Sequence, residues 1–105
     1  MAEDRAYISR LVDVYGAALS PRQRDVVDLY YNEDLSLAEI SENCGITRQG
    51  VRDAIKHGVD MLRSLEQSLG FCAKSEKIAS LAAEIAGCND VESAKIIAEA
   101  IIGEL

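Results

Sequence analysis

Residues 37–56 read LAEISENCGITRQGVRDAIK, and their apolar spacing is that of a helix-turn-helix. A short helix would carry Leu37 and Ile40 on one face, and a longer helix would follow a turn around Gly45. Glycine suits such a bend because it adopts positive φ without steric cost. The second helix would turn three apolar side chains inward: Val51, Ala54 and Ile55. Such a unit presents the outer face of its second helix to a groove or a partner, which favours binding over catalysis.

The candidate contact residues on that outer face are Arg48, Gln49, Arg52 and Lys56. The cations are four residues apart and therefore form one stripe along the helix. One interpretation is contact with phosphates or an acidic surface, with Gln49 and Arg52 reaching base edges. The alternative is a solvated face, because Asp53 and Asp60 interleave with the stripe and Asp60 is placed to pair with Lys56.

A second pair of candidate contact residues, Arg22 and Arg24, opens another predicted helix. Its start is marked by Ser20 as the cap, Pro21 at the first helical position and Gln23 completing a capping box. The two arginines could touch a nucleic-acid backbone beside the helix-turn-helix, or they could be ordinary solvated side chains.

The remaining pattern predicts helices along the whole chain. Ser36 and Glu39 form a second capping box, and Thr47 caps a long helix that ends before Gly70. Asn89 and Glu92 would start the last helix. The predicted helices are residues 4–18, 21–32, 37–44, 48–69, 75–86 and 91–105.

The sequence therefore predicts an all-α protein with a helix-turn-helix domain over residues 1–70 and a C-terminal helical hairpin over residues 71–105. Apolar residues continue past the helix-turn-helix and recur in the last helix, forming a predicted seam of Leu62, Leu65, Leu69, Ile97, Ile101 and Leu105. This seam is either intramolecular core or a dimer interface. We favour a homodimer because a short chain with a wide apolar face gains most from association.

Composition restricts the function classes. The chain has 105 residues and a net charge of −7, whereas proteins that rely on phosphate contacts are usually basic. Residues 20–69 are themselves net acidic, which lowers the expectation of DNA binding. The three cysteines form no CxxC pair and read as reduced thiols of a cytoplasmic protein. No apolar stretch suffices for membrane insertion. No catalytic residues, metal site or cofactor site is predicted, since His57 is the single histidine and no phosphate-binding glycine loop occurs.

Three blocks resemble the YlxM family of small bacterial helix-turn-helix proteins: LSPRQR at residues 19–24, LYYNEDLSLAEI at 29–40 and TRQGV at 47–51. The resemblance implies a core of three to four helices like the C-terminal domain of sigma factors or a winged helix. It also implies a cytoplasmic regulator of the signal recognition particle pathway that binds the particle's protein or RNA, or its receptor. The acidic charge is consistent with a basic partner of this kind.

Two other functions stay open on the sequence alone. The first is a sequence-specific transcription regulator whose dimer places Gln49, Arg52 and Lys56 in successive major grooves of DNA. The second is a sigma-like module that binds RNA polymerase.

Overall fold

The computed structural model describes residues 4–105, and within that range it contains helices and no strand. The prediction of an all-α fold is confirmed. The chain separates into two compact units, Met1–Leu69 (unit 1) and Gly70–Leu105 (unit 2). Unit 1 contains α1 (Arg5–Tyr15), the 3-10 turn η1 (Gly16–Ala18), α2 (Pro21–Tyr31), α3 (Leu37–Cys44) and α4 (Arg48–Leu69). Unit 2 contains α5 (Phe71–Ala86) and α6 (Val91–Glu104).

The starts of α2 and α3 are fixed by the two capping boxes that the sequence predicts. The Ser20 hydroxyl accepts from the Gln23 N–H at 3.2 Å, and the Gln23 side chain accepts from the Ser20 N–H at 3.3 Å. Ser36 and Glu39 repeat the arrangement at 3.1 and 2.9 Å. Each box satisfies two N–H groups that a helix end leaves without a partner.

The turn between α3 and α4 is built from local hydrogen bonds. Gly45 has φ 67° and ψ 32°, and its N–H donates to the Ser41 carbonyl at 3.0 Å. The Ser41 hydroxyl donates to the Ile46 carbonyl. The Thr47 hydroxyl accepts from the Gly50 N–H at 3.0 Å and caps α4, as predicted. The helix-turn-helix is therefore confirmed, with its bend at the glycine.

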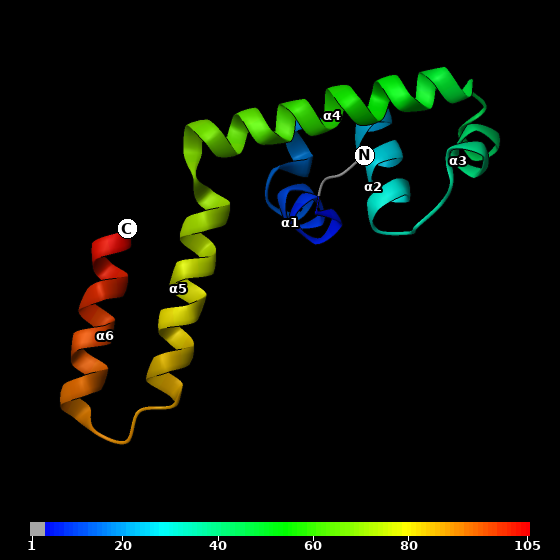
Figure 1. Cartoon of the computed structure of the whole chain (residues 1–105). Helices are drawn as coiled ribbons and strands as arrows, with labels where there is room; N and C mark the ends of the chain where they lie inside the picture. Colours follow the sequence, from blue (N-terminus) through cyan, green and yellow to red (C-terminus); the bar gives the residue numbers. More distant parts are fainter. Residues whose placement is uncertain (1–3) are drawn as a thin grey trace. The chain divides into compact units, whose positions relative to one another are not determined.

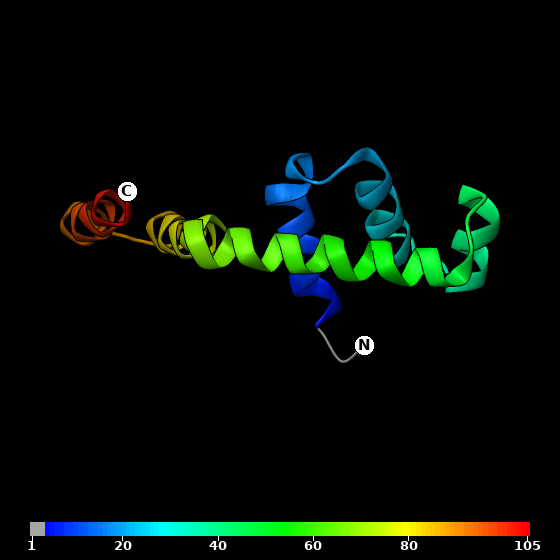
Figure 2. The same cartoon turned by 90° about the horizontal axis from the view of Figure 1, so that it is seen from above.

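The long helix α4 packs across the other three helices of unit 1 (Figure 1). Seen from above, α1 and α2 pass beneath α4 at steep angles (Figure 2). At Gly58 the contact with α2 leaves no room for a side chain, since a Cβ atom would lie 2.8 Å from the Val27 Cγ2 atom. The buried apolar residues of unit 1 are Ile8, Leu11, Val12, Tyr15, Leu19, Val26, Val27, Tyr31, Ile40, Val51, Ile55, Val59 and Leu62.

Two helix boundaries in the sequence prediction need correction. The first helix was expected to run through residue 18, but it ends at Tyr15, where the backbone leaves the helical region at φ −115° and ψ 1°. The 3-10 turn that follows places Leu19 in the core. The fifth helix was expected to start at residue 75, but it starts at Phe71. Gly70, at φ 66°, both ends α4 and precedes α5 without an intervening loop.

The cap of α6 also differs from the prediction. Asp90, and not Asn89, occupies the N-cap position, and its carboxylate accepts from the Ser93 N–H at 2.8 Å. Both residue types suit an N-cap, so composition could not choose between neighbours in the sequence.

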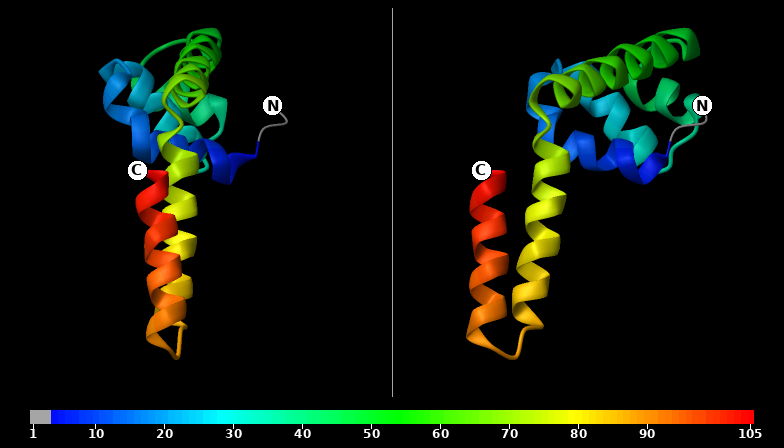
Figure 3. Two further views of the ribbon diagram at one scale, coloured as in Figure 1. Left: turned by 90° about the vertical axis from the view of Figure 1, so that its left-hand side faces the viewer. Right: turned by 60° about the vertical axis from the view of Figure 1, so that its left-hand side comes forward.

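Unit 2 is a hairpin in which α5 and α6 lie side by side and run in opposite directions (Figure 3). The half-buried residues that face between the helices include Ile78 and Ile85 of α5 and Ile97 and Ile101 of α6. No residue of α6 is fully buried. Lys77 and Glu104 form a surface ion pair at 3.0 Å. In residues 4–105, no helix is long and apolar enough to cross a membrane.

Candidate docking groove on the helix-turn-helix unit

The four contact residues predicted on the second helix of the helix-turn-helix lie on the exposed surface of the first three turns of α4. Arg48, Gln49, Arg52 and Lys56 are solvent-accessible, while Val51 and Ile55 on the same turns are buried. The helix begins at Arg48 because Thr47 supplies the cap. The core face and the contact face are therefore separated as a helical period of 3.6 residues requires.

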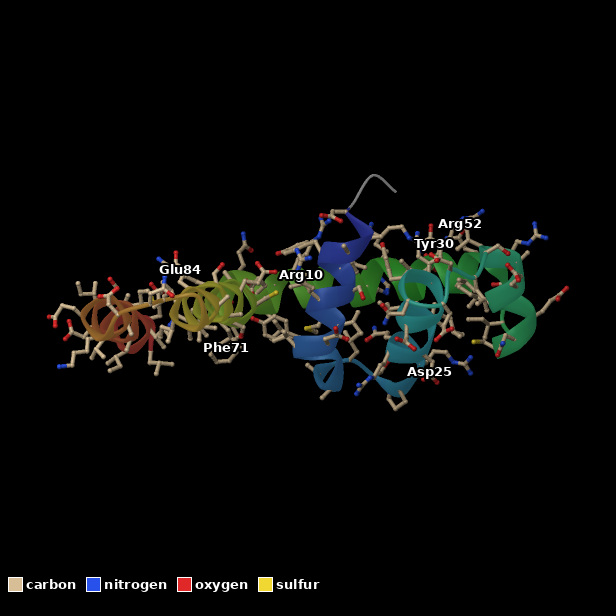
Figure 4. All side chains as sticks on the ribbon, turned by 90° about the horizontal axis from the view of Figure 1, so that it is seen from below. Arg10, Asp25, Tyr30, Arg52, Phe71 and Glu84 are labelled. Atoms are coloured by element: carbon tan, nitrogen blue, oxygen red, sulfur yellow. The ribbon has the colours of Figure 1, made fainter. Side chains whose placement is uncertain are left out.

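A groove of about 690 Å³ runs along this part of α4. One side is α4 itself, and the other is formed by Tyr30 near the end of α2 and Leu37 at the start of α3. Figure 4 shows Tyr30 and Arg52 on the same side of unit 1. The complete lining is Tyr30, Leu37, Gln49, Arg52, Asp53, Ile55, Lys56, Val59 and Asp60. We call this surface the α4 groove.

Charges of both signs line the α4 groove. Arg52 and Lys56 are matched by Asp53 and Asp60 along the same wall. The Gln49 side chain donates to the Asp53 carboxylate at 3.0 Å, so its amide is already engaged within the helix. The expected pair between Lys56 and Asp60 does not form at ion-pair distance in the described part of the chain. The surface therefore offers unpaired cations beside carboxylates and not a uniformly positive field.

The Tyr30 wall of the groove is held by Arg5 from α1. The Arg5 guanidinium donates to the Tyr30 carbonyl and pairs with Asp34 at 3.1 Å. It also lies over the Tyr30 ring, with 4.7 Å from the Cζ atom to the ring centroid. The Tyr30 and Tyr31 rings meet edge to face at a centroid separation of 5.0 Å. These contacts fix the ring that faces α4.

Sequence reasoning missed Tyr30 and Leu37 as groove residues because apolar spacing does not distinguish a core side chain from one that lines a groove. Both are half-buried. The signal available was their position: each lies at the end of its helix nearest the connection between α2 and α3. Only the packing of α2, α3 and α4 brings the two residues opposite Arg52.

The other two predicted contact residues lie away from the α4 groove. The Arg22 guanidinium donates to the Cys44 carbonyl at 3.0 Å, which joins the start of α2 to the end of α3. Arg24 lies against η1, where a Cβ on Gly16 would be 3.4 Å from the Arg24 Nε atom. Neither arginine lines the groove, and eight residues of helix separate Arg22 from Tyr30, or about 12 Å.

Arg22 lines a second groove, of about 680 Å³, between α2 and α3. Its other charged residues are acidic, Asp25 and Asp28. In Figure 4, Asp25 lies on the side of unit 1 opposite Tyr30 and Arg52. The two grooves are thus separate surfaces of the same unit.

The predicted apolar seam is divided among different environments. Leu62 is fully buried in unit 1, Leu65 is half-buried and Leu69 is exposed. In unit 2, Ile97 and Ile101 face α5, and Leu105 is 87% exposed. Within each unit, only part of the seam is therefore free to take part in an interface.

Glu39 and Asp90, two carboxyl groups whose pKa is lowered, take part in helix caps and lie outside the α4 groove. The Ser36 backbone N–H, and then the Ser36 side chain, lower the pKa of Glu39 below its ordinary value. The Ser93 backbone N–H does the same to the pKa of Asp90. Residues 4–105 contain no cluster of three His, Cys, Asp or Glu side chains that could hold a metal ion.

Comparison with known proteins gives the family. Residues 2–100 match the family model described as "Putative helix-turn-helix protein, YlxM / p13 like". The chain belongs to this family. It is 40% identical over 88 residues to the UPF0122 protein TTE1463 of Caldanaerobacter subterraneus, covering 84% of this chain and 75% of that protein. A UPF0122 protein of Acetivibrio thermocellus is 43% identical over 94 residues, covering 89% and 79% of the two chains. One of Clostridium botulinum is 47% identical over 73 residues, covering 70% and 67%.

Membership of the YlxM / p13-like family confirms the resemblance seen in the sequence and agrees with the helix-turn-helix observed in unit 1. The matched segment includes both units but ends before the last turn of α6.

Proposed function

We propose that this chain is a non-enzymatic regulatory protein of the cytoplasm that acts in the signal recognition particle pathway. It would dock through the α4 groove on the particle, either on its protein or on its assembled RNA complex, or on the receptor. The sequence resemblance to the YlxM family supports the pathway, and the chemistry of the groove supports docking on a protein or ribonucleoprotein.

The observation that carries the proposal is the mixture of charges in the α4 groove. A DNA-reading helix gains most of its affinity from positive charge that is not compensated nearby. Here Asp53 and Asp60 line the same wall as Arg52 and Lys56. Carboxylates at this position would repel a phosphate backbone, whereas they complement basic side chains on a protein surface.

The groove also contains the apolar surface that protein docking needs. Tyr30 and Leu37, both half-buried, line it, whereas Ile55 and Val59 are buried at its floor and add little accessible surface. Interfaces between proteins commonly bury an aromatic or apolar centre within a polar rim. A partner segment with one apolar side chain and flanking charges of both signs would fit this arrangement.

The test is a titration of labelled protein against reconstituted signal recognition particle, repeated with excess non-specific duplex DNA. We expect saturable binding that the DNA does not abolish. Arg52→Glu should weaken binding by about tenfold or more, since it reverses a charge at the rim of the docking surface. Lys95→Glu, an exposed cation reversed on α6, is the matched control and should bind like the wild type. Absence of binding at micromolar particle, or equal loss in both variants, would contradict the proposal.

DNA binding is the second candidate, and one observation favours it. Arg48, Arg52 and Lys56 are exposed at the start of the second helix of a helix-turn-helix, and none has an ion-pair partner within residues 4–105. A DNA-binding protein would lose affinity steeply with salt, and Arg52→Ala would relax its sequence preference. Binding to RNA polymerase in a pull-down would instead favour the sigma-like alternative.

A further inference from the structure

The second groove of unit 1, between α2 and α3, differs from the α4 groove in its balance of charge. It measures about 680 Å³, and its charged lining residues are one arginine, Arg22, and two carboxylates, Asp25 and Asp28. The α4 groove has cations and carboxylates in equal number. We call the second surface the α2–α3 groove. A single added cation would make its lining neutral.

Helical spacing places the two carboxylates side by side on α2. Asp25 and Asp28 are three residues apart, a separation that keeps side chains adjacent on one face of a helix. The Asp28 carboxylate accepts from the Asn32 side chain at 2.5 Å. The Asp25 carboxylate makes no hydrogen bond or ion pair with any of residues 4–105. Both of its oxygens are therefore available to a ligand.

Arg22 does not neutralise these carboxylates, because its guanidinium is directed at the backbone of α3. Its Nη1 atom donates to the Cys44 carbonyl at 3.0 Å, which joins the start of α2 to the end of α3. Within the described part of the chain, Arg22 forms no ion pair with Asp25 or Asp28. The one cation of the groove thus holds its two walls together and leaves the carboxylates to a partner.

The end of α3 adds a second source of negative potential. This helix ends at Cys44 in the wall of the groove, and its last turn contains no basic residue. The carbonyl groups at a helix C-terminus carry a partial negative charge that favours a cation. The preference for a cation therefore comes from both walls, from side chains of α2 and from the backbone of α3.

Apolar surface in the same groove suits a long cationic side chain. Leu29 and Cys44 are half-buried and Pro21 is exposed, so accessible apolar atoms line the groove together with the carboxylates. Arginine combines an aliphatic stem with a planar head that binds carboxylates through paired N–H groups. An arginine side chain therefore matches both features of the groove.

We propose that the α2–α3 groove binds an arginine side chain on a segment of a partner protein, with its guanidinium against Asp25 and Asp28 and its stem against Leu29. Charge complementarity supports this occupant, and the net charge of −7 attracts basic segments to the chain. Figure 4 shows Asp25 on the side of unit 1 opposite Arg52. A partner in this groove leaves the α4 groove open, so the inference stands whether or not that groove binds the signal recognition particle.

The test is a titration of the full chain with the peptide acetyl-Gly-Leu-Arg-Leu-Gly-amide, followed through the backbone amide chemical shifts of isotope-labelled protein. We expect a dissociation constant of about 1 mM, because a single side chain with exposed ion pairs binds weakly. The shifts should concentrate on residues 21–29 and 43–44. The same peptide with citrulline, which keeps the shape of arginine without its charge, should bind at least about tenfold more weakly.

Single carboxylate variants separate the groove from the general acidity of the chain. Asp25→Asn should weaken binding of the arginine peptide by about fivefold. Asp13→Asn is the matched control, since it removes an exposed carboxylate of α1 outside the groove and should bind like the wild type. Circular dichroism checks that both variants keep their helices.

Four results would overturn the proposal. The first is the absence of any shift at about 20 mM peptide, which is well above the expected dissociation constant. The second is a set of shifts spread evenly over all acidic surfaces. The third is equal binding of the citrulline peptide, because the charge would then not be recognised. The fourth is an equal loss of binding in Asp25→Asn and Asp13→Asn, because overall charge would then explain the effect.

Discussion

Gly58 of α4 lies so close to Val27 of α2 that no side chain fits between them. A Cβ on Gly58 would be 2.8 Å from the Val27 Cγ2 atom, while the next neighbours, on Gln23 and Leu19, are 3.8 and 3.9 Å away. Real Cβ atoms do not approach other atoms this closely. Gly58 and Val27 are both buried, so their contact sets the spacing between α2 and α4.

Gly58→Ala should therefore destabilise the protein although alanine is the better helix former. The exchange gains about 1 kcal/mol in helix propensity. Overpacking against Val27 costs about 1–3 kcal/mol, so we expect a net loss of about 1 kcal/mol. Urea unfolding followed by circular dichroism measures it. Gly103→Ala on α6, where a Cβ meets nothing within 4 Å, is the control and should be neutral or stabilising. A stabilised Gly58→Ala would show that α2 and α4 can move apart freely.

The capping box of α3 should make stability depend on pH through Glu39. Because its pKa is lowered in the folded protein, the contribution of Glu39 is present in full above the unfolded pKa of about 4.3. It is lost as the pH falls through the lower, folded pKa. In urea unfolding between about pH 7 and 3, the stability difference between the wild type and Glu39→Gln should be constant at neutral pH and change only in the acid range.

Glu42→Gln is the control for that experiment. It removes one negative charge from the same helix, and the Glu42 side chain makes no hydrogen bond within the described residues. The same pH dependence in both variants would mean that the overall charge of the protein, and not the capping box, is responsible.

The N-cap of α6 is Asp90 and not its neighbour Asn89, a distinction that the sequence alone could not make. Asp90→Ala removes the hydrogen bond to the Ser93 N–H and should lower the unfolding midpoint of unit 2, whereas Asn89→Ala should leave it unchanged. Asp90→Asn should restore most of the loss, because asparagine caps a helix nearly as well. Hydrogen exchange of the first-turn amides of α6 gives the most direct measurement. Faster exchange in Asn89→Ala would contradict the assignment.

A hydrogen bond inside unit 1 ties α1 to the far half of α4. The Tyr15 hydroxyl, on a side chain only 6% exposed, donates to the Glu66 carboxylate at 2.5 Å. Tyr15→Phe keeps the ring and removes the donor, so we expect a loss of about 1.5–3 kcal/mol, the range for bonds to charged groups. Glu66→Gln keeps an acceptor and should cost less. Equal stability of Tyr15→Phe and the wild type in urea unfolding would show that water replaces the bond at no cost.

Much of unit 1 could be predicted from the sequence because its decisive signals are local. The boxes at Ser20 and Ser36 and the glycine turn at Gly45 each act within four residues, and all three lie where predicted. The end of α1 at Tyr15 was missed because the 3-10 turn after it serves to bring Leu19 into the core, which is a tertiary requirement. Propensity alone does not contain that information.

Only one wall of the α4 groove, the one formed by α4 itself, could be predicted from the sequence. The spacing of Arg48, Arg52 and Lys56 defines the exposed face of α4, and the structure places them there. The opposite wall, Tyr30 and Leu37, comes from two other helices and depends on how all three pack. The sequence also predicts Arg22 as a contact residue. In the structure, its guanidinium instead donates to the Cys44 carbonyl at the end of α3.

Arg5 shows how a residue outside a surface can control it. Its guanidinium holds the Tyr30 carbonyl, and it lies over both tyrosine rings of α2, at 4.7 and 5.2 Å from their centroids. If a partner docks in the α4 groove as proposed, a genetic screen for chains that no longer bind it would recover changes at Arg5 together with changes at Arg52. The phenotype alone would not tell the residue that meets the partner from the one that keeps the groove in shape.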